Sequence, residues 1–243
     1  MFDIDLEKTN QMLAEQDVIE RVAYGIKTFG SDAVLLSSMQ KTASLLMHCF
    51  YRLGAENDIL FVDTGFHFHE TLNLRDDFMR RYRLNIVTLY PELTPEQQEE
   101  KYTCKLYKTE QGQPTCCKLR KSDPFIRYMN DQNKSLAFGG LRREEGNARA
   151  NLDILSIDPR FGGYRLNPIL DWTEEMVDNY LEKHEVPIHP LHAESYPSIG
   201  CQCCTTAVAP GEEERAGRWR HLRDDGKSGP VYCDINFSDG GGI

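Results

Sequence analysis

Residues 58–65 read DILFVDTG, an apolar run that stops at an acidic turn. This pattern predicts a short buried strand that ends at the Asp-Thr-Gly turn. A helical pattern follows over residues 69–83 (HETLNLRDDFMRRYR), and a second apolar run over residues 85–91 (NIVTLYP) predicts another strand. Strands that alternate with helices are typical of a mainly parallel sheet with helices on both faces. The sequence therefore predicts an α/β fold.

The segments on either side continue this alternation. Residues 25–50 (GIKTFGSDAVLLSSMQKTASLLMHCF) predict a short strand, a turn over residues 29–32, and a long helix capped by Ser31 or Asp32. Further on we expect a polar helix, a helix start interrupted by Pro124, two strands, and a helix capped by Thr173. These segments are residues 93–108, 116–130, 135–143, 164–170 and 173–186. The regular pattern fades after residue 190, and the glycine-rich end predicts a mobile C-terminal tail.

Composition limits the partners of this chain. Its 243 residues suit one main α/β domain, and its net charge of −10 argues against a surface that binds nucleic acid or an anionic membrane. No stretch approaches the roughly 20 apolar residues of a membrane span. The first residues, MFDIDLEKTN, are acidic and unlike a signal peptide. We therefore expect a cytoplasmic protein in which a local basic cluster meets any anionic ligand.

Three turns are candidates for ligand binding. In open α/β sheets the ligand lies beyond the carboxyl ends of the strands, so the TFGSD, VDTG and GGLRR turns are expected to open onto one crevice. A phosphate or sulfate there would need glycine for close approach and cations for charge-assisted hydrogen bonds. The candidate binding residues are Thr28, Phe29, Gly30, Ser31, Asp63, Thr64, Gly65, Arg142 and Arg143.

The cysteines predict a metal centre. A cytoplasmic chain with eight cysteines is not a disulfide framework, because that compartment keeps thiols reduced. Cys49 and Cys104 lie in patterns that suit small buried hydrophobic residues. The remaining pattern combines a vicinal pair, Cys116 and Cys117, with a C-x-x-C pair over residues 201–204. Four such thiolates suit zinc or an iron–sulfur cluster, and the vicinal pair favours [4Fe–4S].

These motifs together resemble one family. From about residue 20 to residue 219 the chain is similar to the assimilatory sulfonucleotide reductases, and within them to the iron–sulfur adenylyl-sulfate (adenosine 5′-phosphosulfate) reductases. The resemblance rests on TFGSD, VDTGFHFHET, CCKLRK, GGLRRE, NPILDWTEEMV, the IGC-x-x-CT pair and ERAGRW. It implies an adenine-nucleotide α-hydrolase-like fold. It also implies a nucleotide-binding reductase domain over residues 1–219 and a C-terminal tail over residues 220–243.

The resemblance also implies roles for single residues. A [4Fe–4S] cluster would be bound by Cys116, Cys117, Cys201 and Cys204, with Cys203 a spare or alternative ligand. Lys121 would lie between the cluster and the phosphosulfate, and Arg143, Arg215 and Arg218 would contact the substrate. Gly30, Asp63 and Thr64 would line the nucleotide pocket. The implied reaction reduces adenosine 5′-phosphosulfate to sulfite and AMP through an S-sulfocysteine, which thioredoxin or a similar thiol then resolves. The family further implies a homo-oligomer, a dimer or a tetramer.

The chain departs from the family where the nucleophile is expected. The family places its reactive cysteine in a Glu-Cys-Gly-Leu/Ile-His motif after the GRW segment. Here the sole cysteine beyond Trp219 is Cys233, which has Tyr232 in place of the glutamate, Asp234 in place of the glycine and Asn236 in place of the histidine. Cys233 is the candidate nucleophile, although an acidic neighbour works against the thiolate form.

The altered motif keeps other functions open. The 3′-phosphorylated nucleotide is an alternative substrate for the same enzyme. A second alternative is an adenylating or sulfur-transferring enzyme of the same nucleotide-binding superfamily. A third is a module that binds a nucleotide or senses redox state without catalysis. The acids Asp171, Glu174 and Glu175 are interpreted as favourable charges at the start of a helix rather than as a site.

Overall fold

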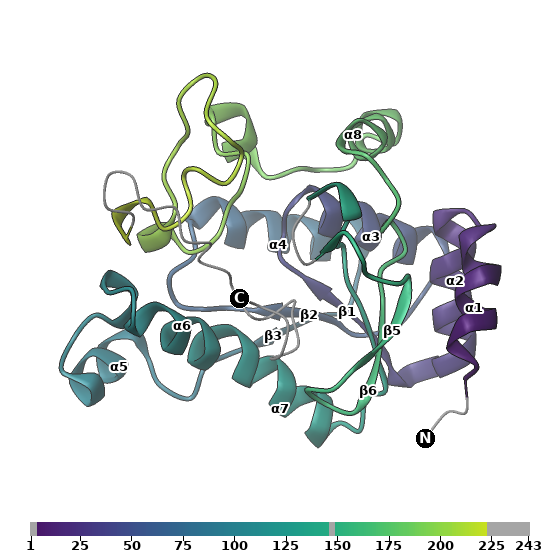
Figure 1. Ribbon diagram of the computed structural model, residues 1–243, viewed down its shortest axis with the longest axis horizontal. Helices are drawn as coiled ribbons and strands as arrows, with labels where there is room; N and C mark the ends of the chain where they lie inside the picture. Colours follow the sequence, from purple (N-terminus) through teal and green to yellow (C-terminus); the bar gives the residue numbers. More distant parts are fainter. Residues whose placement is uncertain (1–3, 146–148, 223–243) are drawn as a thin grey trace.

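The computed structural model describes residues 4–145 and 149–222. The described chain forms one six-stranded sheet with helices on both faces, which confirms the predicted fold class (Figure 1). The strand order is β3-β2-β1-β4-β6-β5, and every pairing is parallel except that between β5 and β6. The strands are β1 (Ala33–Ser37), β2 (Ile59–Val62), β3 (Ile86–Leu89), β4 (Leu136–Phe138), β5 (Leu155–Asp158) and β6 (Gly163–Leu166).

The start of the sheet differs from the prediction. Residues 25–29 are the last part of α2 (Val18–Phe29) rather than a strand, and a short 3₁₀ turn (η1, Gly30–Asp32) leads into β1. The buried positions of α2 recur with helical spacing, whereas the AVLLS run of β1 is buried on both faces like a central parallel strand. The following helix, α3 (Lys41–Arg52), begins eight or nine residues later than predicted and has no side-chain cap from Ser31 or Asp32.

Apolar residues on the two faces of the sheet belong to two separate core clusters. Ala33 and Leu35 pack in the larger cluster, with residues of α2, α3 and α4 (His69–Tyr82). Val34 packs on the opposite face, against Phe125 and Met129 of α7 (Asp123–Asp131). Figure 1 shows α3, α4 and α8 (Glu174–Lys183) above the sheet and α6 (Gly112–Cys117) with α7 below it. The first two helices, α1 (Leu6–Ala14) and α2, lie at one end.

The vicinal cysteines lie on a helical segment that changes type. The chain passes from α6 through one π-helical turn (η3, Lys118–Ser122) directly into α7. Pro124 lies in the first turn of α7, where a missing N–H is tolerated, so the predicted interruption at proline is wrong. Single π turns inside helices are frequent at functional sites. This one separates the cysteine pair from α7 and brings Lys118, Arg120 and Lys121 into one turn.

The C-terminal described segment folds back over the carboxyl edge of the sheet as short turns. Thr205 and Arg218 form an isolated antiparallel bridge, and the Trp219 N–H donates to the Cys204 carbonyl oxygen at 2.8 Å. The Gln202 N–H donates to the Phe66 carbonyl oxygen at 2.7 Å, which ties this segment to the loop after β2. In the part of the chain described here, no helix is long and apolar enough to cross a membrane.

Candidate active site

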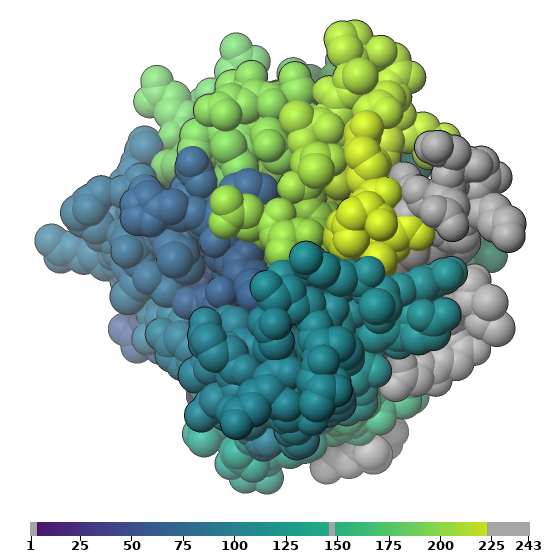
Figure 2. Space-filling model, turned by 90° about the vertical axis from the view of Figure 1, so that its left-hand side faces the viewer, coloured from purple at the N-terminus to yellow at the C-terminus, as the bar shows by residue number. Residues whose placement is uncertain are grey.

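Residues from both halves of the chain enclose a cavity of about 280 Å³ at the carboxyl ends of β1, β2 and β4. Open α/β sheets bind ligands at this edge. The C-terminal segment forms part of its wall, through Pro197–Gly200 and Arg215 with Arg218. Figure 2 views the molecule from this side, where the green-to-yellow C-terminal segment meets the teal residues that include α5 (Pro95–Tyr102), α6 and α7.

The loop between β1 and α3 lines the cavity and was missed by the sequence analysis. The Met39 N–H donates to Ser37 Oγ at 3.3 Å, and Met39 has a left-handed φ of 57°. A residue other than glycine in this conformation is strained, and such strain is concentrated at functional sites. Gln40 Oε1 accepts from the Ile199 N–H at 3.0 Å, which joins this loop to the C-terminal segment. The sequence did contain a signal for this loop, because an apolar strand is followed there by polar residues and then by a helix.

The predicted residues Thr28, Phe29, Gly30 and Ser31 lie at the opposite edge of the sheet. They precede β1, and none of them lines the cavity. Phe29 is buried in the core with its ring centroid 5.5 Å from that of Tyr164. The Gly30 carbonyl oxygen accepts from Asn57 Nδ2 at 2.7 Å. The expectation that TFGSD opens onto the same crevice as the other two turns is therefore wrong, because this turn leads into a strand instead of leaving one.

The VDTG turn lies at the expected edge. Thr64 lines the cavity and is 1% exposed, with its Oγ1 3.4 Å from Cys201 Sγ. Asp63 Oδ1 accepts from the Gly65 N–H at 2.9 Å, and Gly65 has a φ of 71°, so these two residues shape the turn and do not line the cavity. Thr64 is thus the residue of this turn that joins the cavity to a cysteine.

Cysteines from two distant segments converge beside the cavity. Cys116, Cys117, Cys201 and Cys204 are each less than 9% exposed and line one small pocket with Trp219. Two glutamine amides point at the thiol group formed by these four cysteines. Gln98 Nε2 lies 3.5 Å from Cys116 Sγ, and Gln113 Nε2 lies 3.0 Å from Cys117 Sγ. Neither glutamine was identified from the sequence. The contact of Gln98 spans 18 residues and has no local signal, whereas Gln113 lies one helical turn before Cys117, a spacing that could have indicated it.

Two thiols of this group have a raised pKa. Burial raises the pKa of the Cys116 thiol, although the hydrogen bond from Gln98 acts in the other direction. Contact with Cys203 and burial raise the pKa of Cys204, and the two sulfurs lie 3.7 Å apart. Within residues 4–145 and 149–222, no three histidine, cysteine or acidic side chains take up the geometry of a metal site. The donor set itself, four buried thiols with amide donors, has the chemistry of a thiolate-ligated centre.

Cys49 and Cys104 were both predicted to be buried, but their exposure differs. Cys49 is fully buried in α3, as expected, and burial raises its pKa to about 11. Cys104 is exposed, so the prediction of a buried residue is wrong. It follows the end of α5, where Thr103 adopts a left-handed conformation and turns the chain into solvent. Cys233 lies outside the described residues.

Two cations connect the cavity to the thiol group, because Lys121 and Arg218 line both. The Arg218 guanidinium lies 4.6 Å from the centroid of the Trp219 ring and donates to Ser198 Oγ at 3.3 Å. Arg215 also donates to Ser198 Oγ, at 3.5 Å. A Cβ on Gly200 would lie 2.2 Å from Arg218 Nη2, so this glycine is required for the arginine to reach its position.

Arg120 is a structural residue in spite of its place in the basic run. Its side chain is buried, and its Nε donates to the Thr64 carbonyl oxygen at 2.5 Å. Its Nη1 donates to Gln98 Oε1 at 3.0 Å, and its guanidinium lies 4.9 Å over the Phe66 ring. Arg120 therefore fastens the loop after β2 to the segment that carries the vicinal cysteines, and it does not line the cavity.

The two arginines of the GGLRR loop have different surroundings. Arg143 donates to the Leu152 carbonyl oxygen at 2.9 Å and 3.1 Å, and it does not line the cavity. Arg142 lines the cavity but contacts the carboxylates of Glu144 and Glu174. Glu174 was interpreted as a helix-start acid, and it does stand in the first turn of α8. Its ion pair with Arg142 and its place in the cavity wall were not anticipated.

Two half-buried histidines also line the cavity. His67 Nε2 lies 2.9 Å from the Val62 carbonyl oxygen, and His192 Nδ1 lies 3.0 Å from the Tyr196 carbonyl oxygen. Burial lowers the pKa of both imidazoles, which favours their neutral forms. The other ring nitrogen of each, together with Arg218 Nε, is buried without a hydrogen-bond partner in the described structure. Buried polar atoms are normally satisfied, and these three suit a polar ligand in the cavity.

The mainly parallel sheet places a cavity rich in basic residues beside a group of thiols at its carboxyl edge, where open α/β proteins bind their ligands. The sequence model of the phosphoadenosine phosphosulfate reductase domain matches residues 32–207, and the chain belongs to this family.

Relatives named as reductases support the same assignment. The chain is 36% identical over 217 residues to "Adenosine 5'-phosphosulfate reductase" of Halalkalibacterium halodurans, covering 89% of this chain and 92% of the relative. It is 38% identical over 218 residues to the protein of the same name from Shouchella clausii, covering 88% of each. A crystal structure of phosphoadenylyl-sulfate reductase from Candida auris superposes with a TM-score of 0.74 over 86% of this chain and 99% of the other. At 20% identity, that likeness concerns the fold.

Proposed function

We propose that this chain reduces adenosine 5′-phosphosulfate to sulfite and AMP in the cavity at the carboxyl edge of the sheet. The observation that carries the proposal is that Lys121 and Arg218 line both this cavity and the thiol group. An anionic sulfur compound bound by these two cations would lie next to the thiol group. The relatives named for reduction of this substrate, each covered over more than four fifths of its length, support the same activity.

The proposed first step is attack of the Cys233 thiolate on the sulfur of the phosphosulfate. A sulfur–sulfur bond forms while the bond from sulfur to the phosphate oxygen breaks. AMP leaves with the electron pair of the broken bond, and Cys233 carries the sulfonate. Arg215 and Arg218 supply positive charge that favours a thiolate nucleophile and stabilises the departing phosphate.

The proposed second step releases sulfite. A thiolate of a dithiol reductant of the thioredoxin class attacks the Cys233 sulfur, forms a mixed disulfide and displaces sulfite with the electron pair of the broken sulfur–sulfur bond. The second thiol of the reductant then resolves the mixed disulfide and returns Cys233 to its reduced form. The reductant thus supplies the two electrons and ends as an intramolecular disulfide.

Cys116, Cys117, Cys201 and Cys204 are proposed to bind a [4Fe–4S] cluster. Four buried thiols from two segments, with amide donors from Gln98 and Gln113 aimed at sulfur, support this proposal. When bound, the cluster would supply a compact charge beside Lys121 that influences where the anionic substrate sits, and no electron needs to pass through it. We further propose a cytoplasmic location, because the chemistry requires reduced thiols. A homo-oligomer is proposed by analogy with the family alone.

The test is intact-protein mass spectrometry on anaerobically purified protein mixed with adenosine 5′-phosphosulfate and no reductant. We expect one sulfonate adduct, and peptide mapping should place it on Cys233 and not on the exposed Cys104. Thioredoxin should remove the adduct and release one sulfite per chain. Cys233→Ser should bind AMP without forming the adduct. An adduct on a different cysteine would refute the assignment of the nucleophile, and binding without any adduct would refute the thiol mechanism.

A further inference from the structure

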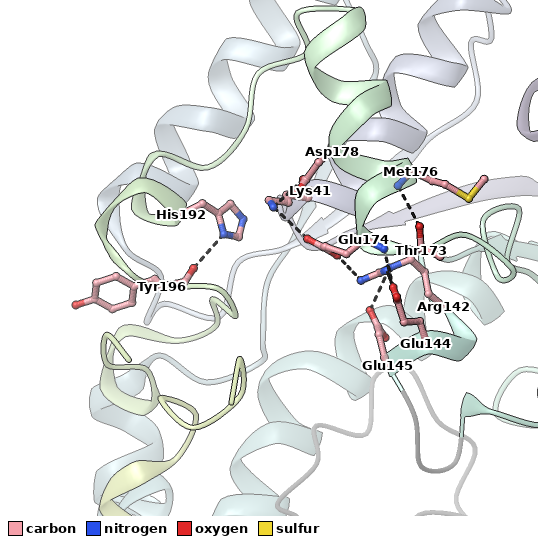
Figure 3. A network of polar contacts seen from close by, with 10 residues as sticks. All are labelled: Lys41, Arg142, Glu144, Glu145, Thr173, Glu174, Met176, Asp178, His192 and Tyr196. Carbon is pink, nitrogen blue, oxygen red and sulfur yellow. Dashed lines mark hydrogen bonds and ion pairs between the residues drawn. The ribbon is translucent and has the colours of Figure 1, made fainter. Parts of the chain in front are cut away.

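A closed network of charged side chains lies at the α8 end of the cavity (Figure 3). Lys41 Nζ lies 3.0 Å from Glu174 Oε1 and 2.7 Å from Asp178 Oδ1. The second oxygen of Glu174 contacts Arg142, whose Nη1 lies 2.6 Å from Glu144 Oε2. Glu144 Oε2 also accepts from the Glu174 N–H at 2.6 Å. Glu174 therefore bridges the two cations that face this end of the cavity.

The network has no surplus of positive charge. Its cations are Lys41, Arg142 and Arg149, and its carboxylates are Glu144, Glu145, Glu174 and Asp178, which gives three positive and four negative charges, a net of −1. The Arg142 side chain is 5% exposed and that of Lys41 is 24% exposed. Burial alone would lower the pKa of Lys41, but its hydrogen bonds to Asp178 and Glu174 raise the pKa overall. Both cations are thus charged and already engaged by carboxylates.

The opposite end of the cavity, beside the thiol group, is lined by Lys121, Arg215 and Arg218, and the exposed Glu214 also lines the cavity. The guanidinium groups of Arg215 and Arg218 lie 5.7 Å and 4.6 Å from the Trp219 ring centroid. An anionic group is therefore drawn to this end, beside the thiol group, and the uncharged part of the same ligand extends toward Glu174.

We propose that Glu174 makes the cavity select an adenosine ligand with a free ribose 3′-hydroxyl over one with a 3′-phosphate. The inference rests on the proposed function, which places the phosphosulfate at the basic end and the nucleoside toward α8. Other nucleotide-binding α/β folds use the same chemistry, in which a carboxylate accepts a hydrogen bond from a ribose hydroxyl and an arginine donates hydrogen bonds to a ribose phosphate. Here the cations that could accept a phosphate are held by Glu174, and the surplus carboxylate repels a dianion.

The structure gives the selection a clear energetic origin. A 3′-phosphate could be accommodated if Lys41 and Arg142 turned toward it, but Glu174, Asp178 and Glu144 would then lose their partners in a partly buried site. Leaving charges unpaired in such a site is strongly unfavourable. A hydroxyl requires no such rearrangement, because a carboxylate can accept a hydrogen bond from it while keeping its ion pairs.

Binding of two products separates this inference from the reaction itself. Isothermal titration calorimetry of the anaerobic holoprotein would compare AMP with adenosine 3′,5′-bisphosphate. We expect the wild type to bind AMP at least about tenfold more tightly, equivalent to about 1.4 kcal/mol. Glu174→Gln removes one carboxylate charge and loosens its hold on Lys41 and Arg142. This variant should bind the bisphosphate about tenfold more tightly than the wild type does, while its affinity for AMP changes by less than about threefold.

The matched control is Glu175→Gln, which removes the neighbouring acid in the same helical turn. Glu175 is exposed and does not line the cavity, so the ratio of the two affinities should not change. If Glu174→Gln does not fold, Asp178→Asn removes the other partner of Lys41 and should shift the ratio in the same direction by a smaller factor.

Two negative results have different meanings. A wild-type protein that binds AMP selectively, with a ratio that neither Glu174→Gln nor Asp178→Asn alters, would overturn the inference and leave the proposed function intact. A wild-type protein that binds neither nucleotide would overturn the proposed function as well.

Discussion

The two ends of the cavity each contain a buried arginine, and the partners of these arginines differ. Arg142, at the α8 end, contacts the carboxylates of Glu144 and Glu174. Arg218, at the thiol end, contacts the Trp219 ring and Ser198, and its Nε has no hydrogen-bond partner in the described structure. Both are about equally buried, with 4% and 5% of the residue exposed. The partners of a buried cation, and not its burial, therefore decide whether it can meet an anionic ligand.

The largest effect is expected at the thiol end, in the cysteine group itself. Cys204→Ser removes a fully enclosed thiol and should abolish bound iron, with a loss of reductase activity of at least about 10³-fold. The matched control is Cys203→Ser, which changes the neighbouring and more exposed thiol. It should keep its iron and most of its activity. Iron analysis and visible absorbance measure the first property independently of turnover, and equal iron loss in both variants would show that Cys203 is a ligand.

A smaller effect is expected from the lysine between the cavity and the thiol group. Lys121→Ala should lower kcat/KM by about 10²-fold, or roughly 3 kcal/mol, because it removes a cation from the end of the cavity that attracts the anion. Lys118→Ala is the matched control in the same π turn. Lys118 has a 59% exposed side chain and pairs with Asp123 outside the cavity. Steady-state kinetics that fall equally for both variants would contradict the distinction between them.

A glycine tests the position of Arg218 without removing its charge. Gly200→Ala places a methyl group about where the guanidinium lies, since the added Cβ would be 2.2 Å from Arg218 Nη2. Gly200 does not have a positive φ, so the backbone tolerates alanine. We expect a fall in kcat/KM of about tenfold. In an Arg218→Ala background the same substitution should have little further effect, and a full additional loss would place its cause elsewhere.

The sequence was informative where a pattern was local. The cysteine pairs and the ERAGRW segment are short motifs, and the structure brings them together at one edge of the sheet. The strand at residues 59–62 and the helix at residues 174–183 also follow from local patterns, a buried apolar run and a capped amphipathic stretch.

The sequence was misleading where a short apolar run was compatible with both a buried strand and a buried helix. The AVLLS run of β1 was assigned to a helix, because a buried strand and a buried helix segment share the same composition. That error moved the candidate phosphate turn to the amino edge of the sheet and hid Ser37, Gln40 and Lys41. Glu174 was missed for a different reason. Its partner Lys41 is 133 residues away, and a helix-start acid already has a sufficient local explanation.

The smallest predicted effect concerns the contact between α4 and the C-terminal segment that carries Arg215 and Arg218. His189 is 1% exposed; its Nδ1 accepts from the Leu191 N–H at 3.3 Å, so the neutral ring carries its proton on Nε2 and donates to Thr71 Oγ1 at 2.9 Å. Burial, reinforced by the nearby His192, lowers the pKa of His189 to about 4.

The folded-state pKa of His189 lies below the unfolded value of about 6.5, so unfolding takes up a proton between these two values. The stability that this histidine contributes is complete above about pH 6.5 and is lost as the pH falls toward 4. We expect the free energy of unfolding to drop by about 1 kcal/mol from this group between pH 7 and pH 5.5.

Urea titrations at the two pH values would show this drop, and His189→Gln should remove the part of the drop that His189 causes. The control His221→Gln changes an exposed histidine and should retain the full pH dependence. If the drop is the same in all three proteins, His189 does not cause it, and the attachment of the C-terminal segment is not sensitive to pH through this residue.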